Sequence, residues 1–193
     1  MTWYVVDGMD GSGKSTVGHI IEDRMVEQGR KVLFLEHPND SCRSGRLAHK
    51  YLHRSGKIAM LLSTTFYIFN VIHSLRFKRK HGKEYDDIIF VRYNMAVGYL
   101  PKCLIKAGYK VISFIFPKPD VSIFVDIDPK SAMERILSRG EDLEMFETEE
   151  KLNKTREKML MLTEGWAIID NTRGLEQTEE SVDWILSEMK HGE

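Results

Sequence analysis

Gly8-Met9-Asp10-Gly11-Ser12-Gly13-Lys14-Ser15-Thr16 follows a short apolar run and opens a segment whose apolar residues recur with helical spacing. The stretch satisfies G-x-x-x-x-G-K-[ST], in which glycines let the backbone curl until successive N–H groups point inward at phosphate oxygens. A strand, a glycine-rich turn and a helix in this order are the context in which the pattern binds a nucleoside triphosphate. A glycine-rich turn entering a helix without a ligand is the weaker alternative.

Each position of this loop has an expected task. The helix N-terminus adds partial positive charge, Lys14 can reach the β- and γ-phosphates, and the Ser15 hydroxyl can ligate Mg²⁺. Asp10 places a negative charge beside phosphates, which indicates a second task such as contacting a substrate hydroxyl or a metal-bound water; its alternative role is to offset the helix dipole. The predicted nucleotide-binding residues are Gly8, Met9, Asp10, Gly11, Ser12, Gly13, Lys14, Ser15 and Thr16.

Short apolar runs alternate with longer periodic segments along the whole chain. Strands are expected at residues 3–6, 32–35, 88–91, 109–116, 121–127 and 167–169. Helices are expected at residues 14–28, 58–78, 95–107 (with Pro101 as a kink), 130–137, 148–162 and 178–190. This alternation predicts an α/β fold, a three-layer α/β/α P-loop domain over residues 1–193 with a mostly parallel, about five-stranded sheet. Residues 38–45 are expected to form a loop, and residues 138–148 a short lid.

Composition narrows the functional classes. The 193 residues carry 28 Lys+Arg against 29 Asp+Glu, a net charge of −1, which gives no support for a nucleic-acid coat or a membrane-surface binder. Cys42 and Cys103 are the two cysteines, so a disulfide framework is excluded and a cytoplasmic location is the default. No uninterrupted run of about 18 apolar residues occurs, so no transmembrane span and no membrane partner are expected.

Three arginines are candidate phosphate-binding residues outside the loop. Arg135 and Arg139 are four residues apart on one helix face and lead into the predicted lid, where they could neutralise charge on the transferring phosphoryl group. A solvated basic helix end is the alternative. Arg92 follows the strand 88–91, and ligands of parallel sheets bind outside the carboxyl ends of strands. It could hold an acceptor phosphate, with a surface ion pair as the alternative.

Three other groups of residues remain open to a structural or a functional interpretation. Phe66 and Tyr67 lie on the helix 58–78 and could stack on a base, although core packing is the commoner role. Asp128 precedes Pro129 and is expected to cap a helix. The basic stretch 73–83 is expected to be the C-terminal end of a helix rather than a nucleic-acid patch.

The order of these features resembles the thymidylate kinase family. The likeness covers nearly the whole chain and is most specific in the phosphate loop and in residues 117–129, which resemble the family's P-x-PD and LDVDP segments. Arg92-Tyr93 is similar to the end of its Asp-Arg-Tyr motif, and residues 135–147 to its lid. The resemblance implies transfer of the ATP γ-phosphoryl group to a (deoxy)nucleoside monophosphate such as dTMP. It implies Asp10 at the acceptor sugar, Arg92 at the acceptor phosphate, and a homodimer.

The chain departs from the family pattern around the acceptor. Val91 replaces the Asp before Arg92, Glu36-His37-Pro38 stands where the family has Arg-Glu-Pro, and Met145 stands at the lid's second Arg. The usual Ala-Asp-Arg on the long helix has no counterpart. Two alternatives therefore stay open: a P-loop kinase for another small-molecule acceptor, and a nucleotide-binding regulatory module with weak catalysis.

Overall fold

A parallel sheet with the strand order β2-β3-β1-β4-β5 organises the molecule, in a computed structural model that describes residues 1–54, 56–100, 102–140, 143–144 and 146–191. Pro101 and Met145 lie outside the described residues. The strands are β1 (Thr2–Asp7), β2 (Val32–Glu36), β3 (Asp87–Val91), β4 (Val121–Asp126) and β5 (Ala167–Asp170). The α-helices are α1 (Lys14–Glu27), α2 (Arg43–Leu52), α3 (Lys57–His81), α4 (Ile105–Ile115), α5 (Pro129–Ser138), α6 (Glu149–Leu160) and α7 (Leu175–His191).

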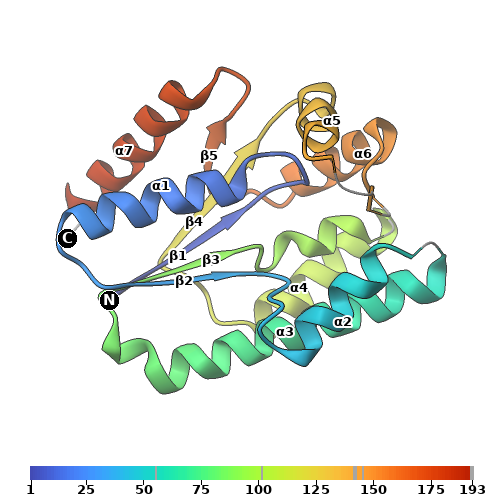
Figure 1. Cartoon of the computed structure of the whole chain (residues 1–193), viewed down its shortest axis with the longest axis horizontal. Coiled ribbons are helices and arrows are strands. Elements are labelled where there is room, and N and C mark those ends of the chain that lie inside the picture. The colour runs from blue at the N-terminus through green and yellow to red at the C-terminus, as the bar shows by residue number, and fades with distance from the viewer. Residues whose placement is uncertain (55, 101, 141–142, 145, 192–193) are drawn as a thin grey trace.

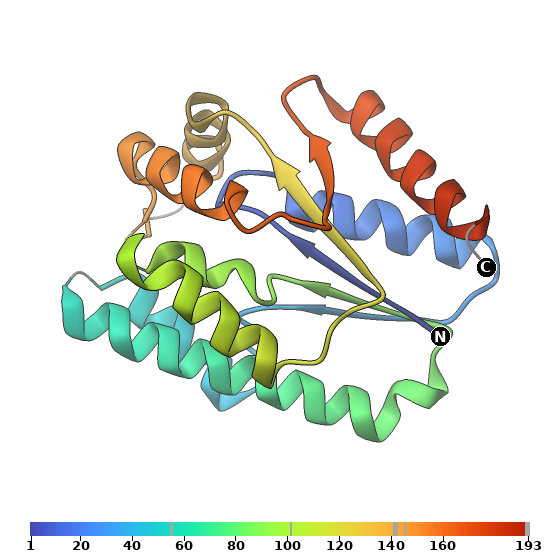
Figure 2. The same cartoon turned by 180° about the vertical axis from the view of Figure 1, so that it is seen from behind.

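Helices cover both faces of this sheet, as Figures 1 and 2 show. Alternate residues of β1 point to opposite faces, so Tyr4 and Val6 pack with α1 and α7, whereas Trp3 and Val5 pack with α3. A third apolar cluster joins the loops at the carboxyl ends of the strands to α4, α5 and α6. The expected three-layer α/β/α fold with five parallel strands is confirmed. Because β1 is central, its carboxyl end lies in the middle of the sheet, which is where the phosphate loop begins.

The segment expected to be a strand at residues 109–116 is instead part of α4, so that prediction is wrong. Its β-branched and aromatic residues favour a strand locally, but Ile105, Tyr109, Ile112 and Phe116 recur at helical spacing and all contact the core. The expected helix at residues 95–107 is replaced by two short 3₁₀ helices, Met95–Tyr99 and Lys102–Leu104, before α4 begins.

Two further helices differ from expectation. Residues 43–52 form α2, although residues 38–45 were expected to be a loop and nothing predicted a helix after them. The segment Ile58–Glu84 covers most of α3 and the 3₁₀ turn that follows it, and it contains an 18-residue window with a mean hydropathy of 1.5. By length and composition alone, such a segment could cross a membrane. The expectation of no transmembrane span counted only uninterrupted apolar residues, which this segment lacks, so it stays a prediction. Because α3 packs on α2 and on the sheet, length and composition do not assign it to a membrane.

Helix α5 begins as its sequence predicts. The Asp128 carboxylate accepts a hydrogen bond from the Ser131 backbone N–H (2.9 Å), and Pro129 occupies the first helical position. The cap fixes the direction in which α5 leaves β4. Arg135 is therefore carried back toward the phosphate loop.

Candidate active site

The phosphate loop joins β1 to α1 at the centre of the sheet. Gly11 and Gly13 adopt positive φ angles of 75° and 88°, conformations that side chains rarely tolerate. A Cβ atom on Gly13 would lie 2.2 Å from the Asn171 side-chain nitrogen, so a larger residue would have to displace the Asn171 amide. Met9 buries its side chain in the core while its carbonyl oxygen accepts a hydrogen bond from Lys14 Nζ (2.9 Å). In contrast, the Thr16 side chain is exposed.

Asp10 is the centre of a buried polar cluster beside this loop. Its carboxylate accepts hydrogen bonds from Arg92 Nη2 (2.8 Å) and the Tyr99 hydroxyl (2.5 Å), and lies 3.4 Å from Lys14 Nζ. Asp10 and Lys14 are 4% and 3% exposed, so these charges interact with little screening. The structure thus brings together three residues predicted separately and adds Tyr99.

The cluster shifts the pKa values of its members in opposite directions. Burial alone would raise the pKa of Asp10, but the charges of Lys14 and Arg92 outweigh it and hold that pKa well below its usual range. Burial lowers the pKa of Lys14 to about 8, with a contribution from the like charge of Arg92 and an opposing one from Asp10. Asp10 is therefore an anion that keeps two cations in place next to the loop.

Arg92 reaches this cluster from an unusual backbone position. It follows β3 with a φ angle of +62°, in the left-handed region that residues with a Cβ seldom adopt. Its guanidinium also donates to the His37 carbonyl oxygen (3.3 Å). The left-handed turn sends the side chain back across the sheet edge toward β1, which places it between the loop and the adjoining pocket.

The oxygen atoms beside Ser15 suit a magnesium ion. The Ser15 hydroxyl donates to the Glu36 carboxylate at the end of β2 (2.6 Å), and Mg²⁺ prefers such hydroxyl and carboxylate ligands. The buried Ser12 hydroxyl has no hydrogen-bond partner within the described part of the chain, so the loop retains an unused polar atom. These donors fit Mg²⁺ bound together with a triphosphate.

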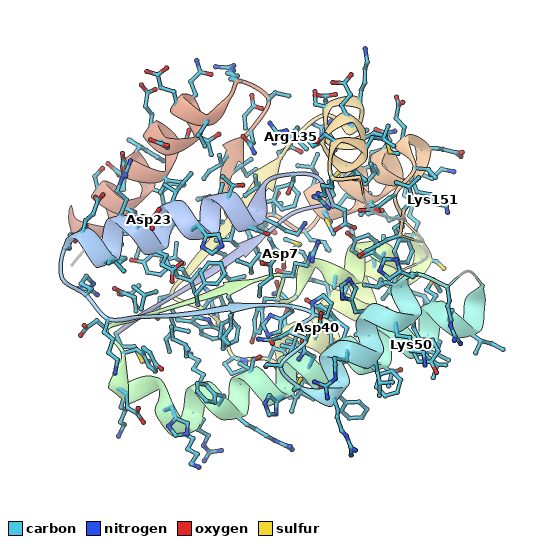
Figure 3. The ribbon with its side chains drawn as sticks, in the orientation of Figure 1. Asp7, Asp23, Asp40, Lys50, Arg135 and Lys151 are labelled. Atoms are coloured by element: carbon cyan, nitrogen blue, oxygen red, sulfur yellow. The ribbon has the colours of Figure 1, made fainter. Side chains whose placement is uncertain are left out.

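Arg135 and Arg139 differ in position. Arg135 Nη2 donates to the Asn171 carbonyl (2.9 Å), and the Asn171 side chain donates to the Ser12 carbonyl (2.7 Å), so Arg135 lies against the loop. Figure 3 shows Arg135 on α5, above the carboxyl end of β1 that Asp7 marks. Arg139 is exposed and lies 3.8 Å from the buried Glu147 carboxylate. The structure therefore brings Arg135, but not Arg139, to the phosphate loop.

A pocket next to Asp10 and Arg92 is the candidate acceptor site. It encloses about 70 Å³, and its walls include Thr64 and Tyr67 of α3 and Glu144 of the segment after α5. Ordinary ligand pockets are several times larger, so an acceptor nucleotide requires the walls to move apart. A larger cavity of about 500 Å³ adjoins it and shares Arg92 and Glu144.

The two aromatic residues predicted to contact a base lie in different places. Tyr67 lines the pocket and donates its hydroxyl hydrogen to the Tyr93 carbonyl (3.1 Å). Phe66 faces α2, where its ring stacks on Tyr51 with centroids 5.8 Å apart. It is not among the residues that line the described pocket.

Sequence reasoning missed several residues of this site. Tyr99, Glu144 and Phe146 border the pocket, and the rings of Tyr99 and Phe146 lie 4.6 Å apart. Glu36 was noted as a departure from a family motif, which is the signal that could have identified it beside Ser15. Asn171 follows the last strand, and its position at a strand's carboxyl end was the available clue.

His37 is a buried, neutral group behind the site. Its Nδ1 lies 2.9 Å from the Arg92 carbonyl and 3.2 Å from the Val91 carbonyl, so Nδ1 carries the proton and Nε2 accepts from the Ser74 hydroxyl (2.8 Å). Burial lowers the pKa of His37 to about 4. In the unfolded chain it titrates near 6.5, so the unfolded state binds the proton more tightly between these two values.

We therefore expect His37 to make the fold acid-sensitive. Its contribution to stability is complete above about pH 6.5 and is lost as the pH falls toward 4, by up to about 3 kcal/mol. Urea unfolding at pH 7 and pH 4.5 measures it: the change in free energy of unfolding should be smaller for His37→Gln than for the unsubstituted chain. Exposed His73→Gln is the control and should leave the pH dependence unchanged. An equal pH dependence for His37→Gln would contradict the assignment.

Comparisons with known proteins agree with this geometry. The thymidylate kinase family model matches residues 6–182. Probable thymidylate kinases of Archaeoglobus fulgidus (28% identical, 94% of this chain and 92% of the relative) and Pyrobaculum aerophilum (29% identical, 96% of both) are similar along almost their whole length. A solved thymidylate kinase from Candida albicans has the same fold, with a TM-score of 0.72, 20% identity and coverage of 100% of this chain and 93% of that one.

Proposed function

Because the chain belongs to the thymidylate kinase family, we propose that it transfers the γ-phosphoryl group of ATP to the phosphate of a (deoxy)nucleoside monophosphate, with dTMP as the first acceptor. The observation that carries the proposal is the buried cluster of Lys14, Asp10 and Arg92, which lies between the phosphate loop and the acceptor pocket. Lys14 thus lies on the side of the ATP donor, and Arg92 lies on the side of the acceptor. The products are ADP and the nucleoside diphosphate.

On the donor side, the loop amides and the N-terminus of α1 bind the ATP phosphates, and Lys14 leaves the Met9 carbonyl to contact the β- and γ-phosphates. Ser15 and Glu36 would hold Mg²⁺, which would supply positive charge beside the ATP phosphates. The carboxylates of Asp10, Glu36 and Glu144 are matched in number by Lys14, Arg92 and Arg135 around the site, so a bound triphosphate would add negative charge that calls for a further cation.

On the acceptor side, Arg92 would bind the monophosphate, replacing part of its contact with Asp10. Asp10 is then free to accept from a sugar hydroxyl or a metal-bound water. Tyr67 and Thr64 border the pocket from one face of α3. Their hydroxyl hydrogens are donated to the Tyr93 and Met60 carbonyls, so their oxygens would accept hydrogen bonds from the base in the absence of the family's arginine. Burial raises the pKa of Tyr67 well above its usual value, so the hydroxyl stays protonated and keeps its hydrogen bond to the Tyr93 carbonyl.

Arg135 and Arg139 are proposed to stabilise the transition state. Arg135 has the stronger support because its guanidinium already lies at the phosphate loop. Arg139 would first have to leave Glu147 before it could contact the phosphoryl group. Residues 138–148 would act as the lid that carries this change.

An assay of ATP consumption across nucleoside monophosphates tests the proposal. We expect Mg²⁺-dependent turnover with dTMP that exceeds turnover with dUMP, dCMP, dAMP and dGMP. ATP binding without turnover on any of them would contradict it and favour a regulatory module. Turnover restricted to a different phosphorylated or hydroxylated metabolite would favour the other alternative.

We also propose that the protein is a cytoplasmic homodimer. Family membership supports the pairing, and α3 leaves Ile58, Leu61 and Phe69 exposed as apolar surface for a second copy. Light scattering on the purified chain tests this, with twice the chain mass expected and the single-chain mass contradicting it.

A further inference from the structure

A second group of ligand-type side chains lies beside the acceptor pocket. His49 is in the last turn of α2, and His53 is the residue directly after that helix. The two histidines are four residues apart, so both imidazoles lie on the same side of α2. Their rings are 5.2 Å apart, and His49 Nε2 lies 3.9 Å from the Glu144 carboxylate. One ligand atom from each of the three residues lies within 4.8 Å of the others.

Asp40 orients His49 from the opposite side. The Asp40 carboxylate lies 3.3 Å from His49 Nδ1, and Figure 3 shows Asp40 on the loop that leads into α2. A carboxylate only accepts hydrogen bonds, so Nδ1 carries a proton, and Nε2, which faces Glu144, is left to hold either a second proton or a metal ion. A lone pair facing a carboxylate is unfavourable unless a proton or a metal ion lies between them. A carboxylate bound to the far nitrogen is the usual partner of a metal-ligating histidine.

We propose that His49, His53 and Glu144 bind one divalent transition metal ion, with Zn²⁺ as the best-suited ion and Asp40 as the residue that orients His49. Two imidazoles and one carboxylate match the ligand set of zinc sites that leave a fourth position open. Ligands of tetrahedral zinc lie about 3.3 Å apart, so side-chain rotations would have to shorten the present spacing of up to 4.8 Å. The site is distinct from the oxygen ligands at Ser15, and it does not depend on the proposed phosphoryl transfer.

A metal ion at this site would also affect the acceptor pocket, because the two share a residue. Glu144 also lines the acceptor pocket together with Arg92. Burial raises the pKa of Glu144, with a further contribution from the charge of Asp10. A bound metal would hold this carboxylate against α2 and remove its negative charge from the space next to Arg92. The metal would therefore join two walls of the acceptor pocket.

Calorimetric titration of the tag-free, chelator-treated chain with Zn²⁺, in excess Mg²⁺ to occupy the oxygen site, tests the proposal. We expect one Zn²⁺ per chain and at least tenfold weaker binding by His53→Ala and by Glu144→Gln. Asp40→Asn should weaken binding by about 10- to 100-fold while leaving the stoichiometry unchanged. His81→Ala is the matched control, because His81 also contacts a glutamate, Glu84 (2.8 Å), and should bind Zn²⁺ like the unsubstituted chain.

Titration with Co²⁺ gives a second readout through its visible absorption, which should show imidazole ligands and be lost in His49→Ala. Thermal melting without metal shows whether each variant is folded. Unchanged Zn²⁺ affinity in folded His53→Ala and Glu144→Gln would overturn the proposal. Loss of Zn²⁺ binding in the single variant His81→Ala or in the single variant Ser15→Ala would place the ion at another site. Either result would also overturn the proposal.

Discussion

Replacing Lys14 with Met should reduce kcat/KM for phosphoryl transfer by about 10²- to 10³-fold, the usual cost of removing one charge-stabilising donor at a transition state. Lys14 is 3% exposed, and its ammonium group lies at the phosphate loop. The fold should survive, because Asp10 keeps its hydrogen bonds to Arg92 and Tyr99. Coupled measurement of ADP release at saturating Mg²⁺ provides the rates.

The control for this experiment is Lys154→Met. Lys154 is an exposed lysine of α6 that pairs with Glu150, so its loss should leave turnover unchanged. If a folded Lys14→Met chain kept activity within threefold of the unsubstituted protein, the role of Lys14 in transfer would be disproved.

The second large effect is expected from Arg92, where Ala and Gly variants separate the side chain from the backbone. Both remove the guanidinium and should raise the KM for the acceptor about 100-fold, with little change in ATP affinity, because Arg92 faces the acceptor pocket. Their stabilities should differ, since φ is +62° at this position and Gly adopts that conformation without strain. Arg92→Gly should be about 1 kcal/mol more stable than Arg92→Ala.

Steady-state kinetics measure the KM for the acceptor, ATP titration measures the affinity for ATP, and urea unfolding measures the stability of the Arg92 variants. Arg76→Ala, at an exposed position of α3, is the control for loss of an arginine. Equal stability of the two Arg92 variants would show that the left-handed backbone costs nothing. Parallel losses of ATP affinity and acceptor KM would assign Arg92 to the donor side instead.

The sequence predicted the features that local chemistry determines. The phosphate loop, the central strand and the Asp128 cap each depend on neighbouring residues, and the structure has all three. Helix α4 was mistaken for a strand because its β-branched residues dominate a short window, whereas contacts with two apolar clusters decide its conformation. The contacts that join the pocket residues were harder still to predict. Tyr99 contacts Asp10 across 89 positions of sequence, and no local pattern encodes that contact.

The hydrogen bond from Asn171 to the Ser12 carbonyl has a consequence for how the protein is made. The two residues are 159 positions apart, so the loop gains this support only after the last strand has been synthesised. A chain truncated before residue 171 contains the complete G-x-x-x-x-G-K-[ST] motif but lacks this hydrogen bond. Incomplete translation products therefore carry the motif of a nucleotide-binding protein while lacking part of the support for its binding loop.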